Sequence, residues 1–322
     1  MEDHITIRPA LAEQFGAALE SMRIILLSAP CGFGKTVTAE KLLSGRRVFR
    51  TDAAVSPLSL PAPDDRWDVL LLDQLQYLKD DSDQQALCEL IRSHPNRRFV
   101  MMTRGVAPGW LVPFQVAGLM TTFSVRDLML DRDTTARLME SFGLTVSELD
   151  LTAIHRETYG YPVAIIIAAQ QILSFGQYGP EVDTAVRHAL FQYFDEVVYR
   201  RFPLPMRRFL LELSLFPSFD AEQARMVSGE NNAGELLRTL QEDTTMMLFD
   251  DLERCHFWEV FQQFLQWELA REYTLEQQKA LYIRGGLYYE LHEDYSSALE
   301  CYAKGGDQKK ISDLLEKNAQ NH

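Results

Sequence analysis

The chain has 322 residues, 46% of them hydrophobic, which is enough for two or three globular domains. No apolar run approaches the roughly 18 residues of a membrane helix, and a start with Glu2 and Asp3 is unlike a signal peptide, so we expect a cytoplasmic protein with no membrane partner. The 32 basic and 46 acidic residues give a formal net charge of −14, which disfavours direct binding of this chain to DNA.

The first predicted strand leads into a phosphate-binding loop. Residues 23–28 form an apolar run typical of a buried parallel strand, and a helix is expected from Thr36 to Leu43. Residues 29–36 fit the P-loop pattern, with Ala29 in place of the first glycine. Glycines let backbone N–H groups point at a phosphate, a lysine adds charge, and a threonine at the helix start can bind Mg²⁺. The predicted nucleotide-binding residues of the loop are Pro30, Cys31, Gly32, Phe33, Gly34, Lys35 and Thr36.

Two alternatives stay open for this loop. It can be a glycine-rich turn that merely joins a strand to a helix. Cys31 is either a plain small loop residue or a thiol whose oxidation blocks the site.

A second predicted strand, residues 68–73, ends with a carboxylate. Asp73 lies where open α/β sheets bind ligands, so we predict that it binds Mg²⁺ together with Thr36; an acidic strand cap is the alternative. Gln74 follows where fast hydrolases of this class usually have an acid. A glutamine orients water but does not take its proton, so we predict catalytic roles for Asp73 and Gln74 in slow ATP turnover, or binding with no turnover.

A third apolar strand, residues 98–102, leads to Arg104 at the same edge of the sheet. Arg104 is predicted to sense the terminal phosphate, or else to pair with an acidic neighbour. Residues 84–94 have helical spacing and can form a crossover, whereas the prolines in 52–66 leave little room for a helix. Residues 1–125 are therefore predicted to be an α/β P-loop domain, a parallel sheet with flanking helices.

Helical patterns replace this alternation beyond Phe123, and we expect a helical domain over residues 126–180. Asp131 or Asp133 can cap a helix that ends at Gly143, and Ser147 can begin another. Gly160-Tyr161-Pro162 then breaks the chain before a strongly apolar helix over 163–173. An ordinary helix–helix turn is the alternative interpretation of this tripeptide.

Two further regions complete the predicted fold, a winged-helix-like domain over 181–272 and tetratricopeptide-like helices over 273–322. Because acidic residues crowd the predicted wing, an intramolecular role fits better than DNA binding. One repeat cannot bury its own face, so we expect the repeats to continue beyond this sequence; a terminal helical hairpin is the alternative. The wing acids are Glu242, Asp243, Asp250, Asp251 and Glu253, and the repeat positions are Tyr282, Gly286, Tyr289, Ala298 and Tyr302.

The stretch Arg8-Pro9-Ala10-Leu11 and the run from Leu27 to Thr36 closely resemble the opening of the MalT-like signal-transduction ATPases, the STAND class of large LuxR-type transcriptional regulators. The later order agrees: Asp73, then Arg104, then Gly160-Tyr161-Pro162, a winged helix and helical repeats. The resemblance implies the N-terminal ATPase part of such a regulator, without the DNA-binding end. ADP would hold a closed form, whereas ATP and an unknown small-molecule or protein inducer would open it for self-association.

The resemblance also implies further nucleotide-binding residues. Pro162 would pack on the adenine, Arg8 and Pro9 would lie near the base, and His256 would lie near the β-phosphate; a packing histidine is the alternative for His256. The sequence departs from the family at Gln74, in the shortened 52–66 connection and in the missing DNA-binding end. A P-loop small-molecule kinase and an AAA+-type DNA-associated ATPase remain as alternative functions for this ATP- or ADP-binding protein.

Overall fold

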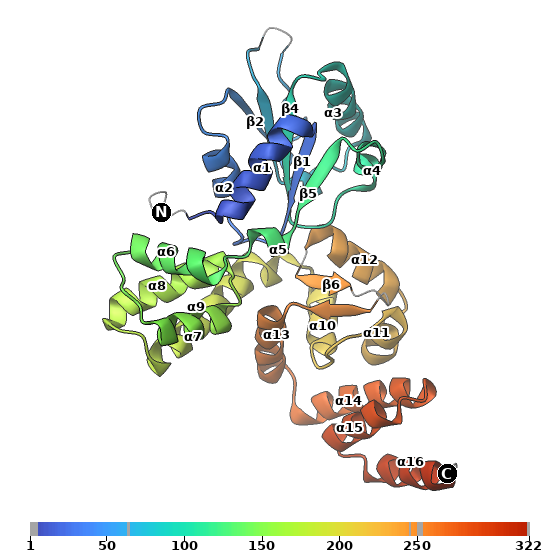
Figure 1. Cartoon of the computed structure of the whole chain (residues 1–322). Helices are drawn as coiled ribbons and strands as arrows, with labels where there is room; N and C mark the ends of the chain where they lie inside the picture. Colours follow the sequence, from blue (N-terminus) through green and yellow to red (C-terminus); the bar gives the residue numbers. More distant parts are fainter. Residues whose placement is uncertain (1–5, 63–64, 245, 250–253, 321–322) are drawn as a thin grey trace. The chain divides into compact units, whose positions relative to one another are not determined.

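The computed structural model describes residues 6–62, 65–244, 246–249 and 254–320 (Figure 1). The chain divides into two compact units, one of Met1–Tyr193 with Gln241–Thr245 and one of Phe194–Leu240 with Met246–His322. Asp250, Asp251 and Glu253 of the predicted wing lie outside the described residues. In the part of the chain that is described, no helix is both long and apolar enough to cross a membrane.

A five-stranded parallel sheet in the order β2-β3-β4-β1-β5 is the centre of the first unit, which confirms the predicted P-loop α/β fold. In the central pairing Leu26 of β1 lies opposite Met101 of β4. Both side chains are fully buried, as expected for a sheet covered on both faces. The strands are β1 (Ile24–Ser28), β2 (Val48–Asp52), β3 (Val69–Asp73), β4 (Arg98–Thr103) and β5 (Met120–Phe123).

Helices flank this sheet. The crossover predicted over 84–94 is α3 (Asp81–Ser93), and it starts earlier because the Asp80 carboxylate caps it, accepting from the backbone N–H of Ser82 at 2.8 Å. The described part of 53–68 contains no helix, in agreement with its prolines. The other helices here are α1 (Pro9–Ser21), α2 (Lys35–Leu42), α4 (Val112–Val116) and the 3₁₀ turns Leu75–Tyr77 and Gly109–Leu111.

The helical region of the first unit follows the sheet. Asp131, rather than Asp133, caps α6 by accepting from the Thr134 N–H, and Ser147 caps α7. An αL residue, Gly176, ends the apolar helix α8, and the next helix then begins at Pro180. The helices are α5 (Val125–Leu128), α6 (Arg132–Ser141), α7 (Glu148–Thr158), α8 (Pro162–Phe175) and α9 (Pro180–Val197).

The second unit begins with the predicted winged helix, in which helices precede a two-stranded antiparallel sheet. The two strands, β6 and β7, pair through Leu248 and His256. The elements are the 3₁₀ turn Tyr199–Arg201, α10 (Leu204–Leu213), α11 (Ala221–Ser228), α12 (Ala233–Asp243), β6 (Met247–Phe249), β7 (Cys255–Phe257) and α13 (Glu259–Glu272).

A helical hairpin of α14 (Leu275–Leu291) and α15 (Tyr295–Gly305) follows, and then α16 (Gln308–Gln320). Gly286 has to be small, because a Cβ atom there would come 2.7 Å from the Tyr302 ring. This pair is the small and aromatic combination that the repeat pattern predicted. The identity of these helices as tetratricopeptide repeats stays a prediction.

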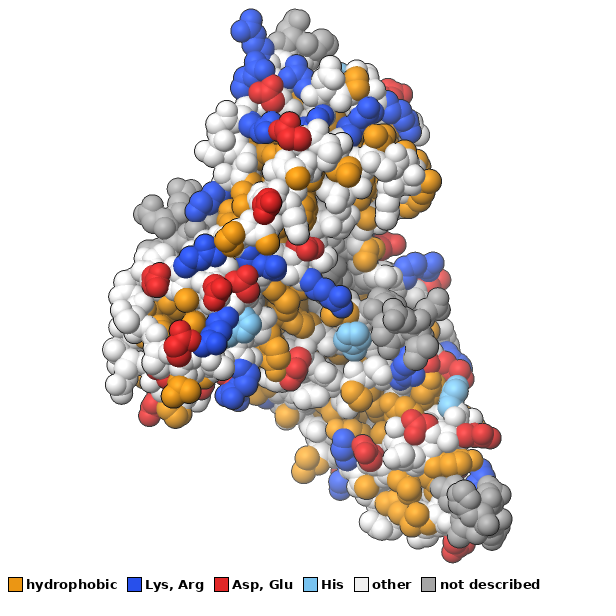
Figure 2. Space-filling model, viewed as in Figure 1, with side chains coloured by type: hydrophobic (Ala, Val, Ile, Leu, Met, Phe, Trp, Pro, Cys, Tyr) orange, Lys and Arg blue, Asp and Glu red, His pale blue; other side chains and the backbone are white. Residues whose placement is uncertain are grey.

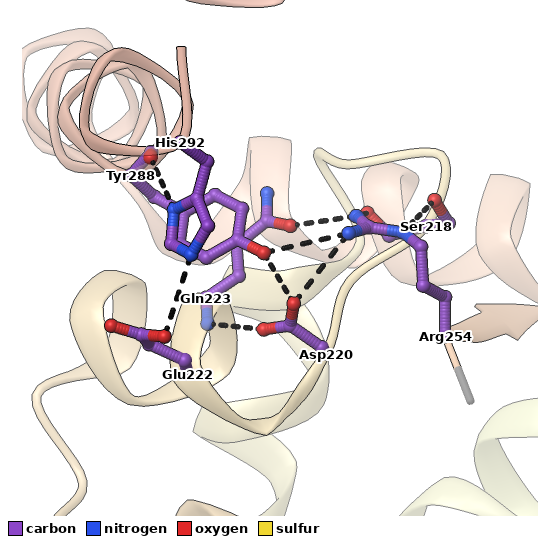
Figure 3. Close-up of polar contacts among 7 residues, drawn as sticks. All are labelled: Ser218, Asp220, Glu222, Gln223, Arg254, Tyr288 and His292. Atoms are coloured by element: carbon purple, nitrogen blue, oxygen red, sulfur yellow. Dashed lines mark hydrogen bonds and ion pairs between the residues drawn. The ribbon is translucent and has the colours of Figure 1, made fainter. Parts of the chain in front are cut away.

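A polar network joins α14 to the winged helix within the second unit (Figure 3). Asp220 caps α11 and accepts a short hydrogen bond from the Tyr288 hydroxyl of α14. Arg254 donates to the Gln223 side chain at 3.0 Å and lies 3.6 Å from the Asp220 carboxylate. His292 of α14 lies 3.5 Å from Glu222.

Candidate nucleotide-binding site

The phosphate loop connects β1 to α2 in the predicted way. Gly32 and Gly34 have positive φ angles of 81° and 71°, which glycine adopts readily. Among the described non-glycine residues, positive φ angles occur at Gln74, Tyr159 and Glu293, so Ala29 does not need the freedom of a glycine. The replacement of the first glycine of the motif by alanine therefore strains neither the loop nor β1.

Lys35 lies at the base of the loop with a side chain that is almost fully buried. Its ammonium donates to the carbonyl oxygens of Ala29 at 2.6 Å and Pro30 at 2.8 Å. Burial lowers the pKa of Lys35 to about 8, and Arg104 acts in the same direction, whereas Cys31 and Asp73 oppose the shift. Lys35 is thus mostly cationic at neutral pH, and a bound anion would stabilise its charge.

The two predicted Mg²⁺ ligands lie together. Thr36 on the first turn of α2 donates through Oγ1 to Asp73 Oδ2 at 3.0 Å, at the C-terminal end of β3. A hydroxyl and a carboxylate are hard oxygen donors, the type that Mg²⁺ prefers alongside phosphate oxygens and water. These residues fit the ion.

Gln74 and Arg104 also lie at this edge of the sheet. Gln74 is held in the left-handed conformation, and its side-chain amide donates to Asp52 Oδ2 at 2.8 Å. Gln74 would have to exchange this hydrogen bond to orient water with its amide N–H. Arg104 forms no ion pair with any residue that the structure describes, and its contact with a terminal phosphate stays a prediction.

A cavity of about 610 Å³ brings these groups together with an apolar surface. That volume is in the usual range for small-ligand sites. Lys35, Thr36, Asp73, Gln74 and Arg104 line its polar part. Most of the apolar part of the wall comes from the N-terminal segment and the helical region: Ile7, Leu11, Leu128, Leu130, Leu138, Phe142, Pro162, Val163 and Ile166.

Pro162 therefore lies in the apolar part of the cavity wall, and its packing on the adenine stays a prediction. Sequence reasoning missed the apolar side chains around it, because Leu138 and Phe142 carry the same helical signal as ordinary core residues.

Tyr161, which directly precedes Pro162, contacts the phosphate loop. Its buried hydroxyl donates to the Cys31 carbonyl at 2.7 Å, and the Val163 N–H donates to the Gly32 carbonyl at 3.2 Å. The Tyr161 ring lies 4.8 Å from that of Phe33, centroid to centroid. Burial raises the pKa of Tyr161 far above its usual value, so the hydroxyl stays a donor. Since carbonyl and N–H of one peptide unit point in opposite directions, these two bonds also orient the N–H groups of Gly32 and Phe33.

The remaining predicted residues have more varied places. Arg8 lines the cavity, and its guanidinium donates to the carbonyls of Arg126 at 2.9 Å and Met129 at 3.2 Å, so it also supports the C-terminal end of α5. Pro9 is exposed as the first residue of α1. His256 lies on β7 of the second unit, and the cavity of the first unit is formed without it. The contact of His256 with a phosphate stays a prediction.

One family of known proteins matches part of this chain. Residues 194–277 match the MalT winged helix domain. The winged helix is thus similar to that of MalT. No curated protein matches the chain in sequence.

Several solved structures are similar to this chain. The Walker-type ATPase of Pyrococcus abyssi superposes with a TM-score of 0.60 and 14% identity over 81% of this chain and 96% of its own. The RuvB Holliday junction branch migration motor of Thermotoga maritima gives a TM-score of 0.47, 14% identity, and 81% and 95% coverage. A STAND protein with a tetratricopeptide repeat sensor from Pyrococcus horikoshii gives a TM-score of 0.36 and 14% identity over 94% of this chain and 49% of its own. At 14% identity the first likeness shows the fold of a P-loop ATPase and nothing about ligands.

Proposed function

We propose that this protein is an ATP/ADP-binding signal-transduction switch with slow ATP hydrolysis. One observation carries the proposal: a single cavity has the phosphate loop on one side and apolar side chains of the helical region on the other. A nucleotide in that cavity contacts both parts, so its identity can bias their arrangement. A ligand shifts a conformational equilibrium only through such differential contacts.

In this proposal the polar end of the cavity holds the phosphates. Lys35 and the loop N–H groups bind them, Thr36 and Asp73 hold Mg²⁺, and Arg104 contacts the terminal phosphate. Mg²⁺, when bound, would neutralise phosphate charge. Asp73 Oδ2 already accepts from Thr36 Oγ1 at 3.0 Å, so the two ligands need little rearrangement. Gln74 orients water without accepting its proton, which keeps turnover slow.

The adenine end rests on the apolar wall. Pro162 packs on the base, while Arg8 and Pro9 shape the entrance from the N-terminal side. His256 of the MalT-type winged helix is proposed to approach the β-phosphate in the ADP-bound form.

The winged-helix match and the helical hairpins support a wider role as the sensor and oligomerisation core of a LuxR/MalT-type transcriptional regulator. In that role a small-molecule or protein inducer favours the ATP form, which self-associates in the cytoplasm. Both basic and acidic groups occur on the face drawn in Figure 2. That mixture and the net charge of −14 support a chain that does not itself bind DNA.

The binding step is tested by denaturing the purified protein and identifying any released nucleotide, and by calorimetry with ADP and ATP in the presence of Mg²⁺. Lys35→Ala should lower the affinity for both nucleotides by about ten-fold or more, since it removes a charge-assisted contact to phosphate. Lys41→Ala is the matched control, because Lys41 lies in the last turn of the same helix and outside the cavity wall. An unchanged affinity in Lys35→Ala would remove the basis of the proposal.

The switch step is tested by the molar mass in solution with ADP and with ATP. We expect a larger assembly with ATP and inducer than with ADP. ATP turnover at about 10 s⁻¹, an ordinary enzyme rate, would instead favour a metabolic P-loop enzyme such as a kinase.

A further inference from the structure

Gln76 lies in the 3₁₀ turn that follows β3, three residues after Asp73. Its neighbours Leu75 and Leu78 are buried in the core beneath the sheet, with 0% and 5% of their surfaces exposed, and they fix the turn. Gln76 itself is 6% exposed, which is unusual for a glutamine. Its side chain is therefore held in a defined place.

The hydrogen bonds of Gln76 determine which way its amide points. The backbone N–H of Arg104 donates to Gln76 Oε1 at 3.2 Å. Only the carbonyl oxygen of an amide can accept that bond, so the assignment of oxygen and nitrogen is settled. The Nε2 group is buried, and no described residue accepts a hydrogen bond from it. A buried donor without a partner is costly in a folded protein, and such groups often serve a ligand.

Gln76 belongs to the wall of the nucleotide cavity. Its neighbours along the wall include Asp73, Thr103 and Arg104, at the end of the sheet where Thr36 and Asp73 meet. These residues are among the polar members of the cavity lining. Gln74, the other glutamine after Asp73, already donates its amide to Asp52.

We propose that Gln76 positions and recognises the terminal phosphate of a nucleoside triphosphate. Oε1 fixes the backbone of Arg104 at the end of β4, and Nε2, which is closed to solvent in this structure, donates to an oxygen of the terminal phosphate after a small shift of the amide toward the cavity. The inference rests on the proposed nucleotide function. ADP lacks that phosphate, so Gln76 favours the triphosphate over the diphosphate. An amide does not titrate, so Gln76 itself adds no pH dependence to this preference.

The test compares Gln76→Met and Gln76→Glu with the control Gln115→Met. Gln115 lies in the same α/β part, on the surface of α4 and outside the cavity wall. Calorimetry with Mg²⁺ measures the dissociation constants of ADP and of the β,γ-imido analogue of ATP. Gln76→Met should lower the affinity for the analogue by about ten-fold, which is the effect of one lost hydrogen bond to a charged group. It should lower the affinity for ADP by less than about two-fold.

Gln76→Glu separates the two halves of the side chain. It keeps an acceptor for the Arg104 N–H but replaces the donor by a carboxylate that repels phosphate, so it should weaken the analogue more than Gln76→Met does. If circular dichroism shows that Gln76→Met does not fold, the affinities of Gln76→Glu for the analogue and for ADP decide the test. The control should keep both affinities.

Three results would overturn the inference. An equal loss of affinity for both nucleotides would show that Gln76 has only a structural role. Unchanged affinities would show that Gln76 does not contact the phosphate. A wild-type protein that binds neither nucleotide refutes the proposed function itself. Normal wild-type binding with an unaltered preference in the Gln76 variants refutes this inference alone.

Discussion

Gly32→Ala isolates the contact between the phosphate loop and the helical region. Gly32 has a φ of +81°, and a Cβ atom there would lie 2.5 Å from the Tyr161 hydroxyl and 2.8 Å from Val163 Cγ1. Gly45, just beyond the other end of α2, has a similar φ of +85° and no atom within 4 Å of an added Cβ. Gly45→Ala therefore has the same backbone strain without the steric overlap.

The magnitudes follow from this difference. An alanine in the left-handed region costs about 1–2 kcal/mol, which is the whole expected loss of stability in Gly45→Ala. Overpacking adds about 1–3 kcal/mol, so Gly32→Ala should lose about 2–5 kcal/mol in total. The loop relieves the overlap by moving away from Tyr161, which breaks the hydrogen bond to the Cys31 carbonyl. ADP affinity should then fall by about ten-fold or more, the equivalent of 1.4 kcal/mol.

Urea unfolding and calorimetry with ADP and Mg²⁺ measure both effects in each variant. Gly45→Ala should keep the wild-type ADP affinity. Adding Tyr161→Phe to Gly32→Ala removes the overlap at 2.5 Å but leaves the one with Val163, so it should recover part of the lost stability. Equal losses of stability in the two alanine variants, with ADP affinity intact in both, would show that the helical region does not shape the loop.

Two further predictions concern single groups of the site. The Lys35 pKa is about 8, and a bound polyphosphate must raise it. The contribution of Lys35 to ADP affinity should therefore be nearly constant below pH 7 and fall above pH 8 by up to about ten-fold per pH unit. A calorimetric ADP affinity that stays constant up to about pH 9.5 would contradict the role of its charge. Tyr161→Phe removes one buried hydrogen bond and should lower the affinity for ADP by about three- to ten-fold in the same assay. Tyr178→Phe is its control, since Tyr178 donates to Asp183 within the helical region at 2.5 Å; equal effects of the two substitutions would rule out a specific role for the Tyr161 hydroxyl.

The phosphate loop and the acidic strand end were predictable because their chemistry is local. A strand, a glycine turn and a helix follow one another over residues 24–42, and the parallel sheet then brings Asp73 to Thr36. Parallel strands have their carboxyl ends at one edge, so a carboxylate at that end must lie near the loop. The placement of Asp73 needed no knowledge of distant contacts.

The other half of the cavity depends on contacts between distant parts of the chain. Tyr161 and the Cys31 carbonyl are 130 residues apart, and Gln76 and the Arg104 N–H are 28 apart. A buried tyrosine and a turn glutamine carry no periodic signal that separates a core role from a functional one. The sequence pattern marked Gly160-Tyr161-Pro162 as a break in the chain, but only the fold shows that the break touches the loop.

The predicted boundary near residue 272 marks a change of sequence pattern, and the contacts across it are tight. Gly285 of α14 leaves no room for a Cβ atom beside Phe216 of the winged helix, and Arg284 donates to the Val227 carbonyl at 2.7 Å. The hydrogen bond between Tyr288 and Asp220 adds a buried polar contact to this packing. Closely packed interfaces shift between discrete arrangements and do not deform gradually. In the proposed switch we therefore expect a displacement of α14 to move α11 with it, so that a change in the first helical hairpin alters the position of the winged helix.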